Sequence, residues 1–392
     1  MTLLPKLFVP AALALACAPV AHAAKTDADA DGITLTSDNG DNQLRIGGRV
    51  HYDIVDIHDD VTAFENRNDF RRARIALSGR FAKDWRFRVE NDVGGTSRGW
   101  KSVWLAYDGF EHWDLRAGHL TAPVGMEPLM GSSDMPLMER SMSSALSPGF
   151  LLGAQATYAR RGWTGTLGYY GNPLDSEQDA SGQDGRGAIA RATWAPVRGK
   201  GRVLHLGTSF ERRRVDPVRV PGGYRISAKP GAGLANATLL NTGAIAGVDH
   251  TRTWGLEAGA VIGPVSLLAE RLQMSVGRHA ASDLLFEGWH TTVSWMITGE
   301  SRRYNEDTGV IGGIRPESRW GALELAARYD RLDLQDGDVT GGVERNLAYG
   351  VNWYYGRNFR LMLDHVDARA IPNRRGVRES VGIDQLRVQV DF

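Results

Sequence analysis

Apolar and polar side chains alternate with a period of two along much of the chain. Early on, Val50, Tyr52 and Ile54 share one parity while Arg49 and His51 share the other. Because successive side chains of a strand point to opposite faces, this pattern predicts strands with one apolar and one polar face. The chain is therefore expected to be all-β. The alternation recurs in residues 72–78, 85–92, 113–118, 253–262, 289–297, 323–330 and 385–392.

Alternation by itself fits either a soluble β-sandwich or a membrane barrel, and three further features favour the barrel. Aromatic residues such as Trp85 and Tyr355 recur at expected strand ends, where membrane interfaces would lie. Short links such as 196–201 alternate with long polar stretches such as 217–249, and the last strand ends on Phe392. We expect a transmembrane antiparallel β-barrel of about 16 strands, which is wide enough for an aqueous channel.

The N-terminal residues predict export. Residues 1–23 have a basic start, an apolar run and a small-x-small cleavage site, as a signal peptide does. Cys17, the one cysteine, lies in this segment; a lipoprotein cysteine is the alternative. Residues 24–43, rich in Asp and Gly, are expected to form a periplasmic N-terminal leader, and residues 44–392 a single barrel domain in the bacterial outer membrane.

Charge and hydropathy exclude two classes of protein. The 46 Lys and Arg balance the 46 Asp and Glu, whereas a nucleic-acid binder would show a basic excess. The mean hydropathy is −0.30 with one long apolar run near the N-terminus, which excludes a bundle of membrane helices. All but six of the basic residues are arginines, whose planar guanidinium groups suit carboxylate and phosphate.

Several of these arginines fall on the polar parity of strands that should be neighbours. There they would concentrate positive charge on one wall of the lumen and guide anions. The alternative is that inward carboxylates (Asp53, Glu90, Asp92 and Asp114) neutralise them and hold the wall together. The sequence leaves both possibilities open. The arginines are Arg45, Arg49, Arg72, Arg74, Arg86, Arg88 and Arg116.

Residues 121–149 break the alternation and carry five of the nine methionines. Irregular backbone cannot face lipid, so this segment should lie at a mouth of the barrel or fold into the lumen, where it would set the narrowest point. A surface loop or a short helix with a methionine stripe is the alternative. The chain shows no nucleophile elbow, zinc-protease motif or phosphate loop, and its histidines lack metal-ligand spacing, so we expect no enzyme, cofactor or metal site.

Five stretches, in chain order, resemble the phosphate-selective porin O and P family of bacterial outer membranes. The resemblance implies a homotrimer of 16-stranded barrels, each with residues 121–149 as an inward-folded constriction loop. The stretches are 70–73 with 84–85, 116–127 with 138–140, 298–304, 312–334 and 347–368.

The resemblance also implies a channel constriction. Arg140 matches the constriction arginine of a Glu-Arg pair, with Glu139 orienting it, and Arg71 and Arg72 match two arginines of an anion-guiding ladder. Arg45, Arg49, Arg74, Arg86, Arg88 and Arg116 would form the anion-guiding lumen wall.

The chain departs from the phosphate-specific members at three places. Pro128 and Ser133 stand where those members carry lysine, and Lys101 stands where they hold an acid beside the constriction arginine. We therefore expect a water-filled porin for small hydrophilic solutes, with some preference for phosphate, polyphosphate or organic anions. A general, weakly selective porin is the alternative. The rivals from other classes are an outer-membrane barrel enzyme and a secreted glycan-binding β-sandwich.

Overall fold

The computed structural model describes residues 23–392 apart from 30–31, 96–97, 175–183, 217–222 and 280. The expected signal peptide therefore lies outside the described residues, except for its last residue, Ala23.

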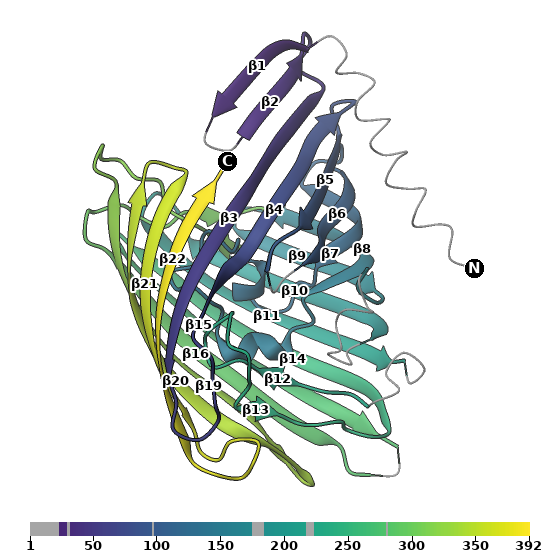
Figure 1. The fold of residues 1–392 in the computed structure, drawn as a ribbon. Helices are drawn as coiled ribbons and strands as arrows, with labels where there is room; N and C mark the ends of the chain where they lie inside the picture. Colours follow the sequence, from purple (N-terminus) through teal and green to yellow (C-terminus); the bar gives the residue numbers. More distant parts are fainter. Residues whose placement is uncertain (1–22, 30–31, 96–97, 175–183, 217–222, 280) are drawn as a thin grey trace.

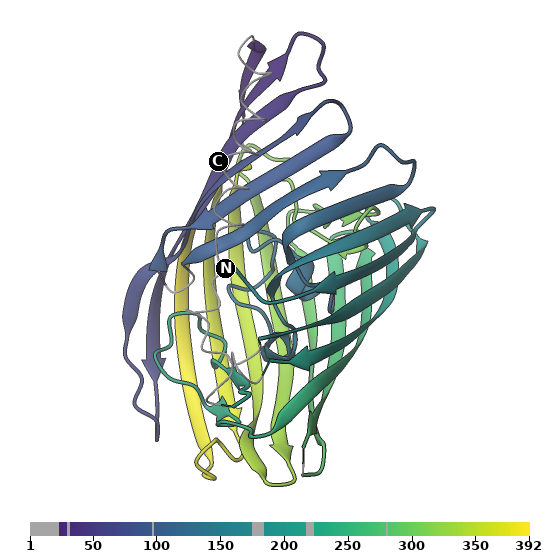
Figure 2. The same cartoon turned by 90° about the vertical axis from the view of Figure 1, so that its right-hand side faces the viewer.

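Sixteen antiparallel strands of the described chain form one closed barrel (Figures 1 and 2). Strands pair in chain order, and β22 returns to pair with β3, from Gly382 opposite His58 to Asp391 opposite Arg49. The 16-stranded barrel is confirmed, and the β-sandwich alternative is wrong because the sheet closes on itself. The strands are β3 (Gln43–His58), β4 (Arg67–Phe81), β5 (Trp85–Asp92), β6 (Gly99–Tyr107), β7 (Trp113–Thr121), β8 (Phe150–Arg160), β9 (Trp163–Tyr170), β10 (Gly185–Val197), β11 (Arg202–Val215), β14 (Val248–Ile262), β15 (Val265–Arg278), β16 (Leu284–Met296), β19 (Ala322–Asp336), β20 (Val339–Tyr355), β21 (Phe359–Ala370) and β22 (Glu379–Asp391).

The leader residues extend the sheet beyond the barrel. The strands β1 (Ala23–Asp29) and β2 (Gly32–Ser37) form a hairpin, and β2 pairs with the first residues of β3, Gln43 to Ile46. Just past this point Phe392 exchanges two backbone hydrogen bonds with Gly48. We call this end of the barrel the hairpin end, and the opposite end the loop end.

The outer wall is apolar and the lumen is polar, as the alternation predicts. Along β20, Leu347, Tyr349, Val351, Trp353 and Tyr355 point outward and are exposed, while the residues between them are buried. Outward aromatic rings pair across neighbouring strands, as in Trp163 stacked on Trp194 with centroids 5.2 Å apart. In the part of the chain that the structure describes, no helix is long and apolar enough to cross a membrane.

The connection between β7 and β8, residues 122–149, folds into the lumen; we call it the inward loop. It contains the short 3-10 helices η3 (Glu127–Leu129) and η4 (Met142–Leu146). Its methionines are buried against the wall: Met126 packs in a cluster with Val203 and Val261, and Met142 in one with Phe286. The irregular, inward segment is confirmed, and the surface-loop alternative is wrong.

Two more connections narrow the lumen, and the sequence did not predict either. The cap loop, residues 223–247 with β12 (Ser227–Ala228) and β13 (Leu240–Asn241), enters from the loop end, where Leu234 packs in a cluster with Leu137 of the inward loop. The hairpin-end segment, residues 297–321 with β17 (Tyr304–Asn305) and β18 (Val310–Ile311), enters from the other side, and Ile311 packs in a cluster with Met126.

Candidate functional site: a cationic constriction

A β-bulge puts two consecutive arginines on the lumen side. In the β3–β4 pair, His51 lies opposite Arg72 and Tyr52 opposite Phe70, so Arg71 is the extra residue. A strict period of two would turn one of the two arginines toward lipid, whereas a bulge re-aims a side chain and lets both face inward. The structure thus places Arg71 and Arg72 together, as the family resemblance implies.

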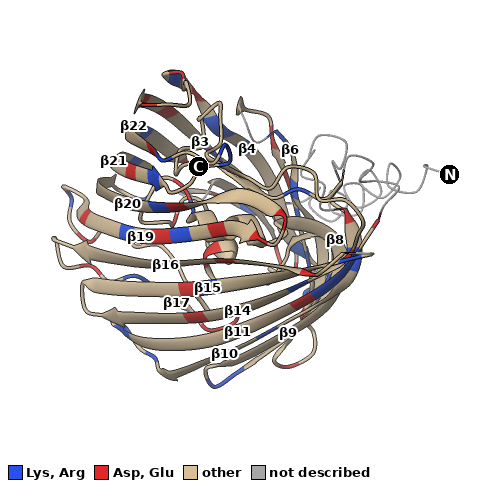
Figure 3. Cartoon of the chain, turned by 90° about the horizontal axis from the view of Figure 1, so that it is seen from below, with Lys and Arg blue, Asp and Glu red and all other residues tan. Residues whose placement is uncertain are grey.

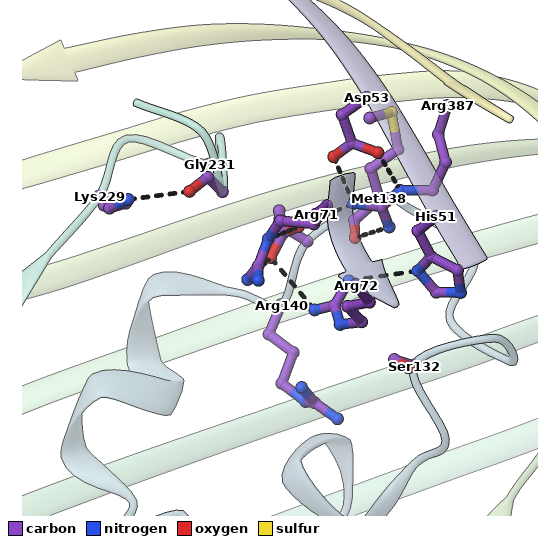
Figure 4. A network of polar contacts seen from close by, with 12 residues as sticks. His51, Asp53, Arg71, Arg72, Ser132, Met138, Arg140, Lys229, Gly231 and Arg387 are labelled. Atoms are coloured by element: carbon purple, nitrogen blue, oxygen red, sulfur yellow. Dashed lines mark hydrogen bonds and ion pairs between the residues drawn. The ribbon is translucent and has the colours of Figure 1, made fainter. Parts of the chain in front are cut away.

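Glu139 of the inward loop joins these arginines, and Figure 4 shows Arg71, Arg72 and Arg387 in the resulting network of polar contacts. Its carboxylate accepts hydrogen bonds of 2.8 and 3.0 Å from Arg71, and Arg72 lies 3.6 Å away. A third guanidinium, from Arg387, donates to the same carboxylate at 2.9 Å. Burial alone would raise the pKa of Glu139, but the three arginines hold that pKa well below its usual range. Glu139 is therefore an ionised junction between the loop and the wall.

Arg387 fixes this junction to the seam where the barrel closes. It lies on β22 directly opposite Asp53 of β3, and its guanidinium makes a bidentate pair with that carboxylate at 2.6 and 2.7 Å. It also donates to the carbonyl of Met138 at 2.6 Å. Asp53 was predicted as a candidate partner for the lumen-wall arginines, but in the structure Arg387 occupies both of its oxygens. A bidentate guanidinium–carboxylate pair is geometrically specific. Because the same guanidinium binds Met138, the pair fixes the position of the inward loop along the barrel axis.

Arg140 has a different environment. Its guanidinium donates to two backbone carbonyls, those of Glu127 at 3.1 Å and Met130 at 2.8 Å, and no carboxylate of the described chain lies within ion-pair distance. Glu139 was predicted to orient Arg140; instead its carboxylate binds Arg71 and Arg387, and the loop backbone orients Arg140. Carbonyl dipoles hold the side chain in place of a paired carboxylate, while burial lowers the pKa of Arg140 and the charges of Glu127 and Glu139 act against that shift.

The cap loop approaches the same place from the loop end. Lys229 donates to the carbonyl of Gly233 at 2.8 Å, and Gly233 lies directly over the ion pair of Arg71 and Glu139. A Cβ at Gly233 would meet Arg71 Nε at 2.0 Å, so only glycine permits this approach. Burial and the nearby Arg71 lower the pKa of Lys229. Lys229 thus adds a cation that no sequence pattern had singled out.

Two cavities of about 790 and 810 Å³ lie between the inward loop and the hairpin end. Gly131 and Asp134 of the inward loop and Asn305 of the hairpin-end segment border both. The lumen-wall arginines divide between them, since Arg45, Arg49, Arg74 and Arg88 line the first cavity and Arg86 and Arg116 line the second. Figure 3 shows that basic and acidic residues both recur along the strands and inner loops.

Most of the lumen-wall arginines are ion-paired. Arg74 contacts Glu90 and Asp92 at 3.1 and 2.9 Å, and Arg88 pairs with the same glutamate. Arg86 and Arg116 both pair with Asp114. Arg49 is 3.9 Å from Glu90, while Arg45 donates to Thr34 of β2 at 3.1 Å. Three of the four carboxylates considered from the sequence therefore do neutralise this wall.

The structure also shows where the three residues lie that depart from the phosphate-specific pattern. Ser133 donates to Asp391 at 2.7 Å and accepts from Arg49 at 3.4 Å, so a neutral hydroxyl stands at the tip of the inward loop. Pro128 lies in η3, and Lys101 lies in β6, where its carbonyl oxygen is 2.6 Å from His119 Nδ1.

Sequence reasoning missed the buried anchor of the hairpin-end segment. Arg302 contacts Glu324 at 2.5 Å and donates to the carbonyls of Asp134 and Gly312 at 2.6 and 3.1 Å. Arg387 lies on the polar parity of the last strand, and Arg302 lies in the stretch 298–304 that resembles the family. Their partners, however, are 22 residues or more away in the chain, beyond what a local pattern can report.

A family model described as phosphate-selective porin O and P matches residues 44–392. The chain belongs to this family. It is 27% identical to Porin O of Pseudomonas aeruginosa, an alignment that covers 94% of this chain and 95% of that protein. Family and fold together make it an outer-membrane porin.

Solved outer-membrane proteins share the fold of this porin at low identity. An anion-selective porin from Comamonas acidovorans has a TM-score of 0.55 and 13% identity, covering 90% of this chain and all of that one. OmpT of Vibrio cholerae, solved in a trimer form, has a TM-score of 0.56 and 9% identity, covering 90% of this chain and 99% of that one.

Proposed function

We propose that this porin passes small anions by diffusion, and that the constriction supplies the preference. Arg71, Arg72 and Arg387 gather there around two carboxylates, Glu139 and Asp53, and the cations Arg140 and Lys229 lie close by without an ion pair in the described chain. Charges that face a narrow pore with low-dielectric walls are weakly screened, so this excess favours anions over cations. The observation that carries the proposal is Arg140, which makes no ion pair in the described chain, so that Glu127 and Glu139 act on its charge only from beyond ion-pair distance.

We infer a broad anion preference in place of strict phosphate selectivity. The tip of the inward loop offers Ser133, already bonded to Asp391, where phosphate-specific members carry lysine. Several weak sites in series let an ion leave again, which suits diffusion more than tight capture. The transported class is therefore small hydrophilic anions, with phosphate, polyphosphate and organic anions as its members.

We further propose a homotrimer. The strands β5, β6, β7 and β9 have only eight or nine residues, at or below the length that spans a membrane in a tilted barrel. The outward face of this region is apolar, with Leu105, Leu152 and Leu167 exposed beside the small Ala117 and Ala154. Such a short, flat wall is better covered by a second copy than by lipid.

We also infer the orientation and processing of the chain. The hairpin end would face the periplasm, and cleavage after Ala23 would start the mature chain at Ala24. N-terminal sequencing of the protein from outer membranes tests this cleavage.

Planar-bilayer recording tests the transport proposal. The purified porin should insert in steps of three, and its reversal potential in a chloride gradient should show anion preference. Millimolar phosphate should reduce the chloride current partially. No selectivity would make this a general porin, complete block by micromolar phosphate would make it phosphate-specific, and the absence of channels would reopen the barrel-enzyme alternative.

A further inference from the structure

A row of titratable side chains crosses the wall behind the inward loop. Glu270 of β15 lies opposite His290 of β16, which lies opposite Asp330 of β19, so the three occupy adjacent inward positions. Glu127 of the inward loop lies over this row. All four residues are at most 5% exposed. Nothing in the constriction described above uses Glu270 or His290.

Three of these groups converge. One ligand atom each from Glu127, Glu270 and His290 can be chosen so that all lie within 4.8 Å of one another, and His290 Nε2 is 3.8 Å from Glu270 Oε2. With metal–ligand bonds of about 2.1 Å, two ligand atoms at a tetrahedral angle lie about 3.4 Å apart. A small inward shift of these side chains would bring them to bonding distance of one ion.

The surrounding hydrogen bonds leave the right atoms available. His290 Nδ1 lies 3.3 Å from Ser143 Oγ, and a proton donated there leaves the Nε2 lone pair as a ligand. His290 Nε2 is buried, points at the carboxylates and has no hydrogen-bond partner among the described residues. Ser141 and Ser144 bind Glu127 Oε2, and Arg328 lies 3.4 Å from Glu127 Oε1. The Glu270 carboxylate accepts from the backbone N–H groups of Met126 and Glu127. Each carboxylate oxygen has a second lone pair, which a metal ion would use.

The charge of the row also favours a bound cation. In the described chain one guanidinium contacts this row, that of Arg328, which lies 3.4 Å from Glu127 and 3.3 Å from Asp330, and the charge of Arg140 acts on Glu127 from beyond ion-pair distance. Buried carboxylates in excess need a cation or protons, because an isolated buried charge is very costly. The three carboxylates Glu127, Glu270 and Asp330 outnumber the guanidinium groups of Arg328 and Arg140, so the row keeps negative charge that a bound cation would neutralise.

We propose that Glu127, Glu270 and His290 bind a divalent transition-metal ion that fastens the inward loop to the barrel wall. One imidazole nitrogen and two carboxylate oxygens form a donor set that suits zinc better than calcium or magnesium, which take oxygen ligands. The loop residue Glu127 and the wall residues Glu270 and His290 would then be crosslinked by one ion. Because the site is buried, the ion would enter as the barrel folds.

His205 provides a matched control within the same lumen. It is also buried beside a glutamate, but both of its ring nitrogens have partners, Tyr304 at 2.8 Å and Glu257 at 2.9 Å. Its substitution removes a buried histidine of equal size without touching the proposed ligands.

The test refolds the full chain in detergent with zinc, removes free metal by gel filtration and measures bound zinc by mass spectrometry. We expect about one zinc per chain for the wild type and for His205→Gln, and less than a tenth of that for His290→Gln and Glu270→Gln. Equal zinc in His290→Gln and His205→Gln, or no zinc in the wild type, would overturn the proposal and leave protons as the neutralising charge.

Cobalt in the wild-type protein gives a second readout that needs no variant. Cobalt bound by one nitrogen and two oxygens should show visible absorption bands at one equivalent, and zinc should abolish them. Cobalt that gives no bands with the folded porin would equally contradict the proposal. Folded barrels and heat-unfolded chains migrate differently in denaturing gels. Refolding with zinc should also raise the temperature at which the folded band of this porin gives way to the unfolded one.

Discussion

Replacing Arg140 with glutamine tests whether an unpaired charge sets the selectivity. In the described chain the guanidinium donates to the carbonyls of Glu127 and Met130, so the substitution removes one charge and no ion pair. Arg86 is the control, because it lines the second cavity between Asp108 and Asp114 and its loss is the same change of one charge.

The size of the effect follows from Coulomb's law. A monovalent anion about 4 Å from the guanidinium gains about 1 kcal/mol at the dielectric constant of water and about 4 kcal/mol at the value typical of a protein surface. Since about 1.4 kcal/mol is a factor of ten, even the lower figure is about fivefold. For Arg86→Gln we expect less than about twofold, because Arg86 is ion-paired with Asp108 and Asp114, which already offset its charge.

The assay is the reversal potential in planar bilayers with a tenfold KCl gradient, together with the phosphate concentration that halves the current. Arg140→Gln should lower the chloride-to-potassium permeability ratio at least about fivefold. Arg140→Lys keeps the positive charge but loses the planar guanidinium group, so this variant should retain most of the anion preference. It therefore distinguishes loss of charge from loosening of the inward loop. Equal shifts in Arg140→Gln and Arg86→Gln would refute the reasoning.

Two further substitutions test the junctions around the lumen. Glu139→Gln removes the carboxylate shared by Arg71 and Arg387, so anion preference and phosphate block should strengthen about threefold while the barrel melts at a lower temperature; unchanged phosphate block would contradict this. Arg302→Met breaks the buried pair with Glu324 at a cost of about 3–5 kcal/mol, so the hairpin-end segment should loosen and the open-channel current should become noisier. Arg303→Met, an adjacent exposed arginine at the first cavity, should leave the current quiet, and equal noise in both variants would count against the anchor.

The sequence predicted the barrel because its strands follow one local rule. Inward and outward positions alternate, so parity alone places Arg74, Arg86, Arg88 and Arg116 in the lumen. The period-two rule fails at the bulge, where Arg71 and Arg72 both face inward. Only the family resemblance identified that pair. The cap loop and the hairpin-end segment were missed for a different reason, since their positions depend on long-range packing of Leu234 and Ile311.

The sequence left two interpretations of the lumen arginines open; the ion pairs of the described chain favour neutralisation for most of the wall, and anion guidance stays a prediction. Arginines beside inward carboxylates, such as Arg74 between Glu90 and Asp92, hold the wall and add little net field. Three arginines share Glu139, and backbone carbonyls hold Arg140, so we expect these residues to leave a net positive field at the constriction. Counting arginines therefore does not predict selectivity in such a barrel. What decides it is how many lack a carboxylate of their own, and that depends on contacts between segments far apart in the chain.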